Sequence, residues 1–375
     1  MRILVNAIND NATPRGPDRY LGELLQALAQ VDRENEYVVL RAPWQTWYGD
    51  LMKAPNFRFV TLSAPRSRYL RIPWQVIVLP LILRRYRPDV VHLPNTILMW
   101  RNGFKVIMTI HDVAEFQFPE KFNRLRAYAR RALAWAAGRA VDRIIAVSDY
   151  TKKTTVRALG IDPGLVIVVP EGVRLREVDA AACDAVRKRY GLSREFLLYV
   201  GVLERTKNVE GIVQAFARTD HRIRDRYDVV LVGRPGNATR DVLKAIAREG
   251  IGDRVRHLGH VSEDDLAGLF RSARLFVFPS LVEGFGLVVL EAMGYGTPVI
   301  ASTAGAIPEV AGGAALLVDP LDSTALRQAI ENVLSDDALR CRMIESGLKR
   351  TAEFSWSRAA REMLGIYAAV GGALT

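Results

Sequence analysis

The 375-residue sequence has few of the residues that mark several classes of protein. Its two cysteines, Cys183 and Cys341, are too few and too far apart for a disulfide scaffold or a cysteine metal site. Its longest apolar segment, residues 72–83, is interrupted by Gln75 and Pro80 and is too short to span a bilayer. No Gly-x-Gly-x-x-Gly follows a predicted strand, which argues against a dinucleotide-dependent oxidoreductase.

The first residues also lack the features of an export signal. The start, MRILVNA, has neither a long apolar region nor a small-residue cleavage site, so it predicts a first strand. Together with the scarcity of cysteine, this leads us to expect a cytoplasmic protein.

Positive charge is abundant and unevenly distributed. Residues 1–172 carry 25 Lys and Arg against 15 Asp and Glu, whereas residues 173–375 carry 27 against 26. Within the first half, residues 51–143 hold 17 basic and 5 acidic side chains. One face of this half is therefore expected to meet an anionic partner. A nucleic acid, a lipid headgroup and a phosphorylated substrate all fit this charge.

Both halves alternate aliphatic runs with amphipathic helical stretches. Aliphatic strands that do not alternate with polar residues are buried on both faces, and helices between them imply right-handed crossovers. The sequence therefore predicts an α/β protein of two doubly wound, Rossmann-like domains, residues 1–172 and 173–353. A last amphipathic helix, within residues 354–375, is expected to cross back to the first domain. The predicted strands are RILVNA, YVVLRA, FRFVTL, DVVHLP, KVIMTI and RIIAVS, then EFLLYVG, YDVVLVG, VRHLGHV, LFVFPS, TPVIAS and GAALLVD.

Ligands of such sheets bind beyond the carboxyl ends of the strands. Four loops at predicted strand ends are candidates to face a central cleft between the domains: 16–19, 111–112, 201–207 and 283–287. In the third, Arg205 and Lys207 follow a strand that ends in glycine. Two cations there are suited to a diphosphate, with lysine as a point charge and arginine as a fork. Taken alone, they fit solvated loop charges at least as well.

The stretch EGFGLVVLE offers further groups that a nucleotide-sugar site would need, namely backbone N–H donors and two carboxylates. Gly284 and Gly286 allow the backbone to approach a ligand, and the helix that starts near Gly286 offers free N–H groups to a phosphate. Glu283 precedes this helix and Glu291 lies one to two turns further along, so one suits sugar hydroxyls and the other a ribose. As an alternative, Glu283 offsets the helix dipole and Glu291 is a solvated helix residue. The combination fits a nucleotide-sugar better than this alternative does.

On these residues, the sequence resembles the retaining GT-B glycosyltransferases of family 4, or group 1. Glu283 and Glu291 match the E-x7-E signature, and PSLVEGFGLVVLEAMGYGTPVIASTAGAIPEV matches the donor-domain pattern nearly throughout. The resemblance covers essentially the whole chain and is most specific in residues 195–320. The stretches TIHDVAEFQFPE and FSWSRAA resemble the subgroup that contains bacterial O-antigen and exopolysaccharide mannosyltransferases.

The resemblance implies roles for the matching residues of the second domain. Glu283 would bind hydroxyls of the donor sugar, and Glu291 would bind the ribose. Backbone N–H groups would hold the sugar and diphosphate, and these belong to Phe285, Gly286 and Leu287.

Further roles are implied outside that stretch. Lys207, with Arg205, would neutralise the diphosphate. His111 would reach the donor sugar from the first domain, although a His-Asp pair at a strand end also fits a simple cap. Gly16 would bring the first loop near the β-phosphate. The resemblance thus assigns catalytic roles to His111 and Lys207 together with Glu283.

Two positions depart from the family pattern. Relatives often have a double glycine or GxGRY in the first loop, whereas this chain has Pro17 and Asp18 after Gly16. Subgroup members commonly read Pro-Arg-Lys-Asn where this chain reads Arg-Thr-Lys-Asn, so Arg205 is shifted by one position. Lys207 is accordingly the stronger candidate for the phosphate contact.

The family implies a retaining, metal-independent transfer of a hexose from a nucleotide-sugar to a lipid-linked or saccharide acceptor. The sequence contains no Asp-x-Asp, and neither a metal nor a cofactor is expected. The subgroup suggests GDP-mannose as the donor, and a UDP-sugar with a soluble acceptor is the alternative. Other hypotheses are a nucleotide-sugar epimerase or a phosphorylase of the same fold, and a sugar-binding module without catalysis.

The basic first half predicts a surface for a membrane rather than for nucleic acid. Residues 65–88 and 121–139 place arginines among aliphatic and aromatic residues. We expect this domain to dock on the anionic inner face of the cytoplasmic membrane, where a lipid-pyrophosphate-linked acceptor would be held. The alternative is a pair of core-packing segments with solvated cationic rims.

Overall fold

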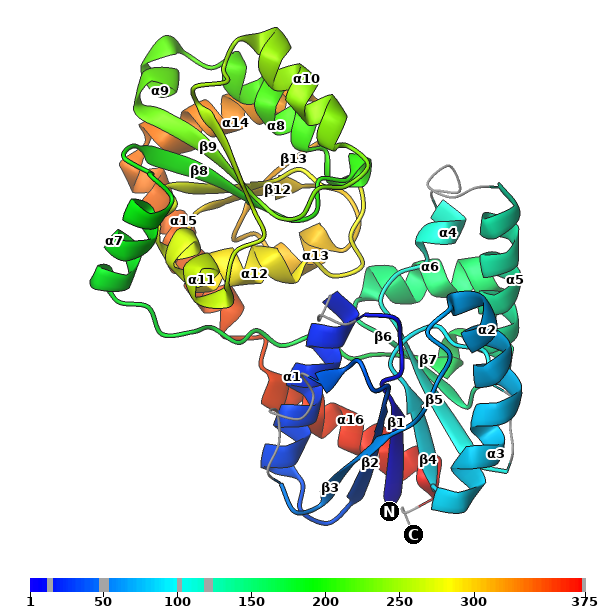
Figure 1. Cartoon of the computed structure of the whole chain (residues 1–375). Coiled ribbons are helices and arrows are strands. Elements are labelled where there is room, and N and C mark those ends of the chain that lie inside the picture. Colours follow the sequence, from blue (N-terminus) through cyan, green and yellow to red (C-terminus); the bar gives the residue numbers. More distant parts are fainter. Residues whose placement is uncertain (12–15, 47–53, 100–102, 118–123, 373–375) are drawn as a thin grey trace. The chain divides into compact units, whose positions relative to one another are not determined.

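The chain forms two compact units in the computed structural model, which describes residues 1–11, 16–46, 54–99, 103–117 and 124–372. The first unit comprises Met1–Gly172 and Ser355–Thr375, and the second comprises Val173–Phe354 (Figure 1). Each unit contains one parallel β-sheet with helices on its faces. Lys121, at the start of the second basic segment, lies outside the described residues.

The first unit contains a seven-stranded parallel sheet. Its strand order, β3-β2-β1-β4-β5-β6-β7, is that of a doubly wound sheet in which the order of the strands reverses between β1 and β4. Ligand sites of such sheets lie outside the carboxyl ends of the strands at this reversal. The strands are β1 (Arg2–Asn6), β2 (Glu36–Arg41), β3 (Phe57–Thr61), β4 (Val90–Leu93), β5 (Lys105–Ile110), β6 (Arg143–Ala146) and β7 (Val166–Val168).

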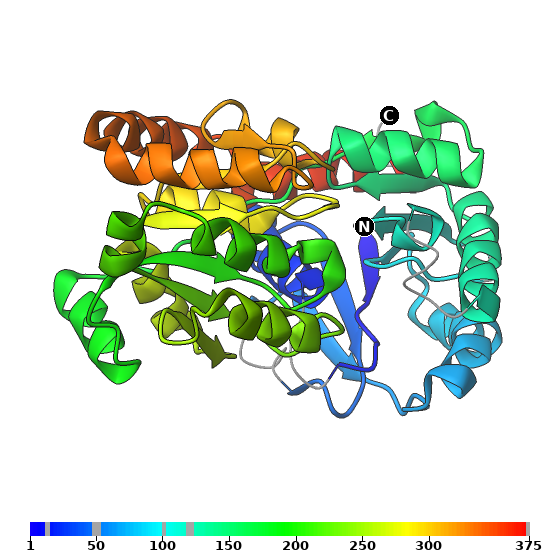
Figure 2. The same ribbon diagram turned by 90° about the horizontal axis from the view of Figure 1, so that it is seen from above.

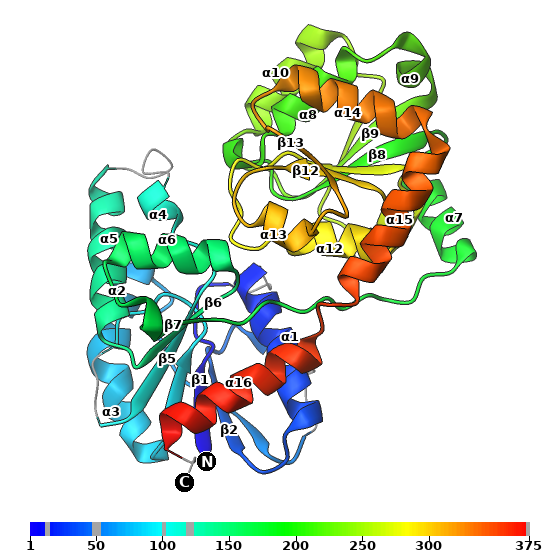
Figure 3. The same cartoon turned by 180° about the vertical axis from the view of Figure 1, so that it is seen from behind.

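Helices cover this sheet on both faces. The helices α1 and α16 pack against each other, and Figure 3 shows α16 crossing the strands beside α1. The opposite face is covered by α3 and α5, whose buried residues join strand residues such as Leu4, Val91 and Met108 in one core. The helices are α1 (Gly16–Val31), α2 (Arg68–Pro73), the π-helical turn η2 (Trp74–Val78), α3 (Leu79–Leu83), the 3-10 turn η3 (Arg84–Tyr86), α4 (Ala114–Gln117), α5 (Arg124–Arg139), α6 (Asp149–Leu159), the 3-10 turn η5 (Pro163–Leu165) and α16 (Trp356–Gly371).

Local sequence sets the ends of several of these helices. Ser148 caps α6 by accepting a hydrogen bond from the Thr151 N–H at 3.0 Å, and Gly160 ends the helix in the left-handed conformation. Ser355 caps α16 in the same way by accepting from the Arg358 N–H. Among the described helices, none combines the length and the apolar character needed to cross a membrane.

The second unit repeats the doubly wound arrangement with six parallel strands in the order β10-β9-β8-β11-β12-β13. Helices α8, α10 and α14 pack together, while α12 packs on α15; Figure 2 shows α14 and α15, in orange, side by side. The strands are β8 (Glu195–Val200), β9 (Tyr227–Val232), β10 (Val255–Gly259), β11 (Leu275–Phe278), β12 (Val299–Ser302) and β13 (Leu316–Val318). The helices are α7 (Ala180–Arg189), the 3-10 turn η6 (Arg205–Lys207), α8 (Val209–Ala217), α9 (His221–Arg226), α10 (Thr239–Glu249), α11 (Glu263–Ser272), α12 (Leu287–Gly294), α13 (Ile307–Ala311), α14 (Ser323–Ser335) and α15 (Asp337–Thr351).

The last helix returns to the first unit and is anchored there by buried polar contacts. The His92 side chain on β4 lies 2.7 Å from the Tyr367 hydroxyl of α16 and 2.8 Å from the Thr109 hydroxyl of β5. A Cβ on Gly172 would lie 2.2 Å from the Trp356 backbone nitrogen, so only glycine fits where the chain leaves this unit. Two doubly wound α/β units, with a last helix that packs on the first, are thus confirmed.

Candidate functional site

Three glycines form the carboxyl edge of the second sheet. Gly201 and Gly233 follow β8 and β9 with φ angles of 155° and 143°, and Gly259 ends β10 with φ of 69°. A Cβ on Gly233 would lie 1.9 Å from the Gly201 carbonyl oxygen, so the two strand ends touch through backbone alone. This edge therefore leaves backbone groups close to any ligand that binds there.

Beside this edge, Lys207 and Glu283 form an ion pair. The Lys207 ammonium donates to Glu283 Oε1 at 2.5 Å and lies 5.7 Å from the centre of the Phe278 ring. The two side chains are 23% and 14% exposed. Partial burial strengthens such a pair relative to a surface ion pair, because less water screens it.

Backbone contacts hold the loops that carry the two charges together. The Thr206 carbonyl accepts from the Leu281 N–H at 2.7 Å and from the Ser280 hydroxyl at 3.1 Å. Burial raises the pKa of the neighbouring Tyr199 well above its usual value, and the negative charge of Glu283 raises it further. Tyr199 therefore stays neutral beside the pair.

The helix α12 begins at the same place. Gly286, its N-cap residue, has φ of 97° and no side chain, so the first-turn N–H groups are not capped by it. A Cβ at Gly286 would lie 2.4 Å from the Ile307 side chain, and one at Gly305 would lie 2.6 Å from the Glu283 backbone. These close approaches fix Glu283, Phe285 and the helix start in one rigid turn.

Glu291 lies on α12 and is only 5% exposed. The alternative that it is a solvated helix residue is therefore wrong. It lies four residues into the helix, about 6 Å along the axis from the helix start at a rise of about 1.5 Å per residue. A buried carboxylate at such a position is costly unless polar groups contact it.

Arg205 and Lys207 contact different carboxylates. Its guanidinium donates to Asp241 Oδ2 through Nε at 3.2 Å and Nη2 at 3.1 Å. The side chain is 73% exposed. A contact between Arg205 and a phosphate would compete with this ion pair to Asp241 on α10.

The first unit carries the remaining two predicted site residues. Gly16 is the first residue of α1 and is exposed. His111 follows β5, and both of its ring nitrogens have protein neighbours. Its Nε2 lies 3.1 Å from the Pro94 carbonyl oxygen, and its Nδ1 lies 3.5 Å from Glu171 Oε1. Since a carbonyl can only accept, Nε2 carries a proton and Nδ1 faces the carboxylate.

Sequence reasoning missed the residues that orient His111. Glu171 is buried, and Tyr20 packs edge-on against the His111 ring with centroids 4.7 Å apart. The only local signal for Glu171 was an acid beside Gly172 at the expected domain boundary. Tyr20 gave none, because it reads as an ordinary buried residue of α1.

The departure in the first loop also has a structural explanation. Asp18 is buried and accepts from the side-chain amides of Asn9 at 2.6 Å and Asn11 at 2.8 Å. It thereby ties the loop after β1 to the first turn of α1, where an acid also suits the helix dipole. The side chain that replaces the family's second glycine is thus a structural tether.

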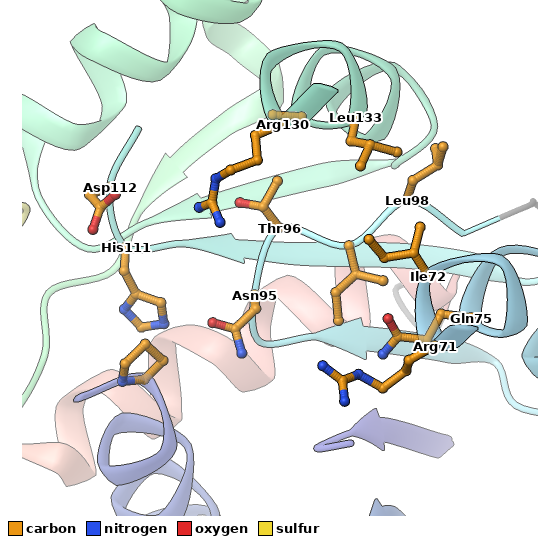
Figure 4. Close-up of a pocket in the computed structure, with 13 residues that line it drawn as sticks. Arg71, Ile72, Gln75, Asn95, Thr96, Leu98, His111, Asp112, Arg130 and Leu133 are labelled. Carbon is orange, nitrogen blue, oxygen red and sulfur yellow. The ribbon is translucent and has the colours of Figure 1, made fainter. Parts of the chain in front are cut away.

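His111 also lines a pocket of about 340 Å³ built from first-unit residues (Figure 4). The pocket lies beyond the carboxyl ends of β4 and β5, where Asn95 and Thr96 follow β4. Arg71 reaches it from α2 and Arg130 from α5. Both arginines belong to the basic segments 65–88 and 121–139, but the sequence alone does not bring them together.

The groups brought together in the second unit suit an anionic, hydroxyl-bearing ligand. A lysine and an uncapped helix start favour phosphate oxygens, and two partly buried carboxylates favour hydroxyl donors. Among the described residues, no group of three or more His, Cys, Asp or Glu side chains is arranged to hold a metal ion.

Comparison with known families agrees with this arrangement. Residues 185–350 match the family described as glycosyl transferases group 1. Residues 14–177 match the family described as glycosyltransferase family 4. The first match lies within the second unit, and the second match covers most of the first unit and extends to residue 177.

Two relatives come from Escherichia coli. The O-antigen chain mannosyltransferase B is 32% identical over 290 residues, covering 76% of this chain and 75% of the relative. The serotype-specific mannosyltransferase WbdA is 28% identical over 284 residues, covering 72% of this chain but only 34% of the relative.

Solved structures share the fold over nearly the whole chain. Sucrose-phosphate synthase from Thermosynechococcus elongatus has a TM-score of 0.80 at 23% identity and covers 99% of both chains. Anabaena HepE in complex with UDP and glucose has a TM-score of 0.76 at 19% identity, covering 98% of this chain and 100% of that one. The two doubly wound units are thus those of GT-B glycosyltransferases, and the chain belongs to glycosyltransferase family 4, the group 1 glycosyl transferases.

Proposed function

We propose that this glycosyltransferase moves a hexose, with mannose from GDP-mannose as the expected case, from a nucleotide-sugar to a lipid-linked or saccharide acceptor. The observation that carries the donor half of the proposal is the Lys207–Glu283 pair beside the uncapped start of α12. A diphosphate and a sugar are the two ligands that such a cation, carboxylate and helix terminus recognise side by side.

In the proposed complex, binding of the donor replaces the ion pair between Lys207 and Glu283. Lys207 turns from Glu283 to the diphosphate, and the Glu283 carboxylate accepts from hydroxyls of the sugar. The N–H groups of Phe285, Gly286 and Leu287 face the phosphate and sugar oxygens. Glu291, further along α12, accepts from the ribose hydroxyls.

We propose retention of anomeric configuration without a metal ion. The acceptor oxygen attacks the anomeric carbon on the face from which the nucleoside diphosphate leaves. The bond from that carbon to the phosphate oxygen breaks, and the departing oxygen takes the acceptor proton. Lys207 and the helix start stabilise the charge that grows on the diphosphate, which is the main task of the protein in this mechanism.

The choice of mannose rests on relatives rather than on a contact. Both Escherichia coli relatives are named as mannosyltransferases, and the first covers three quarters of each chain. The structure of HepE with UDP and glucose supports a nucleotide-sugar donor but favours a different base and sugar. A UDP-sugar with a soluble acceptor is therefore the second candidate.

The decisive experiment is a donor screen. The full chain would be incubated with GDP-mannose, UDP-glucose and other nucleotide-sugars, without and then with a mannose-terminated acceptor. Hydrolysis and transfer from GDP-mannose, with an α-linked product by NMR, are expected. Turnover of UDP-sugars alone would replace the mannosyl assignment, and an inverted product would refute retention.

We further propose that the first unit docks on an anionic membrane. Exposed apolar residues gather on two of its helical segments: Tyr69, Leu70, Ile77, Val78 and Leu81 on α2 to α3, and Tyr128 and Trp135 on α5. The opposite side of α3 is core, with Leu79 and Leu83 buried. A segment that packs inward and also exposes aliphatic and aromatic groups among arginines suits a membrane interface.

Charge near these residues would draw the unit to anionic lipid. Arg84, Arg85 and Arg87 are exposed at the end of α3, and each basic residue near an anionic surface contributes about 1 kcal/mol. Sedimentation with anionic and neutral liposomes tests this, and anionic binding that falls at high salt is expected. Arg84→Gln with Arg85→Gln should weaken binding more than Arg222→Gln with Arg342→Gln, two exposed arginines of the second unit. Equal binding to both liposome types would refute docking and favour a soluble acceptor.

A further inference from the structure

The pocket of the first unit combines cationic and sugar-compatible groups (Figure 4). Its walls include Arg71 and Arg130, with Asn95, Thr96 and Gln75 between them and His111 at one end. Asp112, which is exposed, is the carboxylate among the lining residues. The balance of formal charge on the walls is therefore positive.

Arg71 is the more buried of the two arginines. Its side chain is 7% exposed, and Nη1 donates to the Arg66 carbonyl at 3.2 Å. Its ionic neighbour is Asp10, at 3.5 Å from Nη2, and that carboxylate is itself 57% exposed. An exposed carboxylate at this distance offsets little of the charge of a buried guanidinium. Arg71 is therefore suited to bind a further anion from the pocket.

Arg130 approaches from another helix. It lies on α5 and is half-buried, and Figure 4 shows its guanidinium extending toward Thr96 while that of Arg71 extends toward Asn95. Two guanidinium groups that line one pocket from separate helices suit the oxygens of a phosphate or diphosphate, which arginine binds through paired hydrogen bonds. The amides of Asn95 and Gln75 suit hydroxyl groups alongside.

We propose that this pocket binds a phosphate or diphosphate group carried by the acceptor, with Arg71 and Arg130 as its ligands. The inference rests on the proposed transfer reaction and specifies that the acceptor of that reaction carries a negatively charged phosphate group. The donor diphosphate has its own ligands in the second unit, Lys207 and the start of α12.

The surroundings of the pocket indicate which acceptors fit. The two helices that carry its arginines also carry exposed apolar residues: Tyr69 and Leu70 adjoin Arg71, and Tyr128 and Trp135 share α5 with Arg130. A lipid linked through diphosphate to a saccharide presents an anion next to an apolar chain. A soluble sugar phosphate presents the anion alone, so both sources share the chemistry that the arginines recognise.

The test compares two variants that lose the same charge. Arg130→Gln removes a guanidinium that lines the pocket. Arg131→Gln removes the guanidinium of the next residue, which donates to the Phe116 carbonyl at 3.3 Å and does not line the pocket. Three acceptors with the same saccharide are used: one joined to an alkyl chain through diphosphate, one joined to that chain by a neutral glycosidic bond, and one bearing a 1-phosphate without a chain.

Arg130→Gln is expected to raise KM about tenfold to a hundredfold for phosphate-bearing acceptors and to leave the neutral acceptor unchanged. Arg131→Gln should leave all three near the wild-type value. An effect limited to the diphosphate-linked chain identifies the lipid-linked source, and an effect on both phosphates identifies the anion itself. Equal changes for neutral and charged acceptors, or equal changes in the two variants, would overturn the proposal.

A binding measurement keeps the pocket testable apart from turnover. All six tryptophans lie in the first unit, so titration with inorganic pyrophosphate can be followed by their fluorescence. Arg130→Gln should weaken this binding at least tenfold, while Arg131→Gln and Lys207→Ala should not. Weakening by Lys207→Ala alone would assign the signal to the donor site and refute the pocket. If the wild-type chain transfers no sugar but binds pyrophosphate, and Arg130→Gln weakens that binding, the proposed function is refuted and the pocket assignment holds.

Discussion

The two units share the order of their first six strands but differ in how they present charge. The second unit is nearly balanced in charge, and its Lys207–Glu283 pair is part of a turn of glycines and backbone contacts. The first unit carries the excess of basic residues, and its pocket is made by long side chains from separate helices. A backbone-built site suits an invariant group such as a diphosphate, whereas a side-chain-built pocket can change with the acceptor while the sheet stays the same.

The largest effect is expected at Glu283. Glu283→Ala should lower transfer about a hundredfold to a thousandfold, because it removes the proposed ligand of the reacting sugar and leaves Lys207 without its partner. Binding of free GDP should persist, since GDP lacks the hexose that is transferred. Steady-state kinetics and GDP titration measure the two effects.

Glu291→Ala is the matched comparison for Glu283. It should weaken GDP itself, because the ribose is common to donor and product. If both variants weaken GDP equally, the division of roles within EGFGLVVLE is wrong.

Lys207→Ala should reduce kcat/KM about tenfold to a hundredfold, which corresponds to a charged hydrogen bond of about 1.5–3 kcal/mol. Part of the loss should appear in kcat, because charge grows on the diphosphate as the bond breaks. Arg205→Ala is the control, since Arg205 is exposed and paired with Asp241; a change of less than about threefold is expected. A larger loss with Arg205→Ala would show that it leaves Asp241 for the donor.

A pH effect should distinguish the first unit from the second. Burial, and then the nearby charge of His111, lowers the pKa of His92 from 6.5 to about 3. Below about pH 6.5, His92 therefore binds a proton in the unfolded chain but stays neutral in the folded unit. Stability contributed by neutral His92 is complete above pH 6.5 and is lost as pH falls toward 3, at up to about 1.4 kcal/mol per pH unit.

Urea unfolding followed by tryptophan fluorescence reports on the first unit, because all six tryptophans lie there. His92→Gln should lessen the decline of stability between pH 6.5 and 5. His221→Gln, at an exposed histidine of the second unit, should leave that decline unchanged. An identical pH dependence in wild type and His92→Gln would contradict the expectation.

The smallest effect is expected from chelation. If Lys207 and the start of α12 supply the charge that the diphosphate needs, EDTA should leave transfer unchanged, and added magnesium or manganese should not raise it. Activity lost in EDTA and restored by either ion would show that the second unit needs a metal for the donor.

Much of the proposed donor site could be predicted from the sequence because its parts are local. Glycines, two glutamates and a helix start fall within EGFGLVVLE, and periodicity alone placed them after a strand. The pairing of Lys207 with Glu283 across 76 positions could not be read from that stretch. Arg205 and Lys207 looked alike in sequence, and only their partners, Asp241 and Glu283, separate them.

By itself, the sequence determined the two doubly wound units, because buried aliphatic strands alternating with amphipathic helices admit few other arrangements. It also determined the helix caps at Ser148 and Ser355, which depend on neighbouring residues. Only the tertiary structure decided which distant side chains meet: His92 with Tyr367 across 275 positions, and Arg71 with Arg130 in one pocket. The reason is physical: periodicity and caps act over a few residues, whereas these contacts depend on how strands order themselves in a sheet and how helices pack on it.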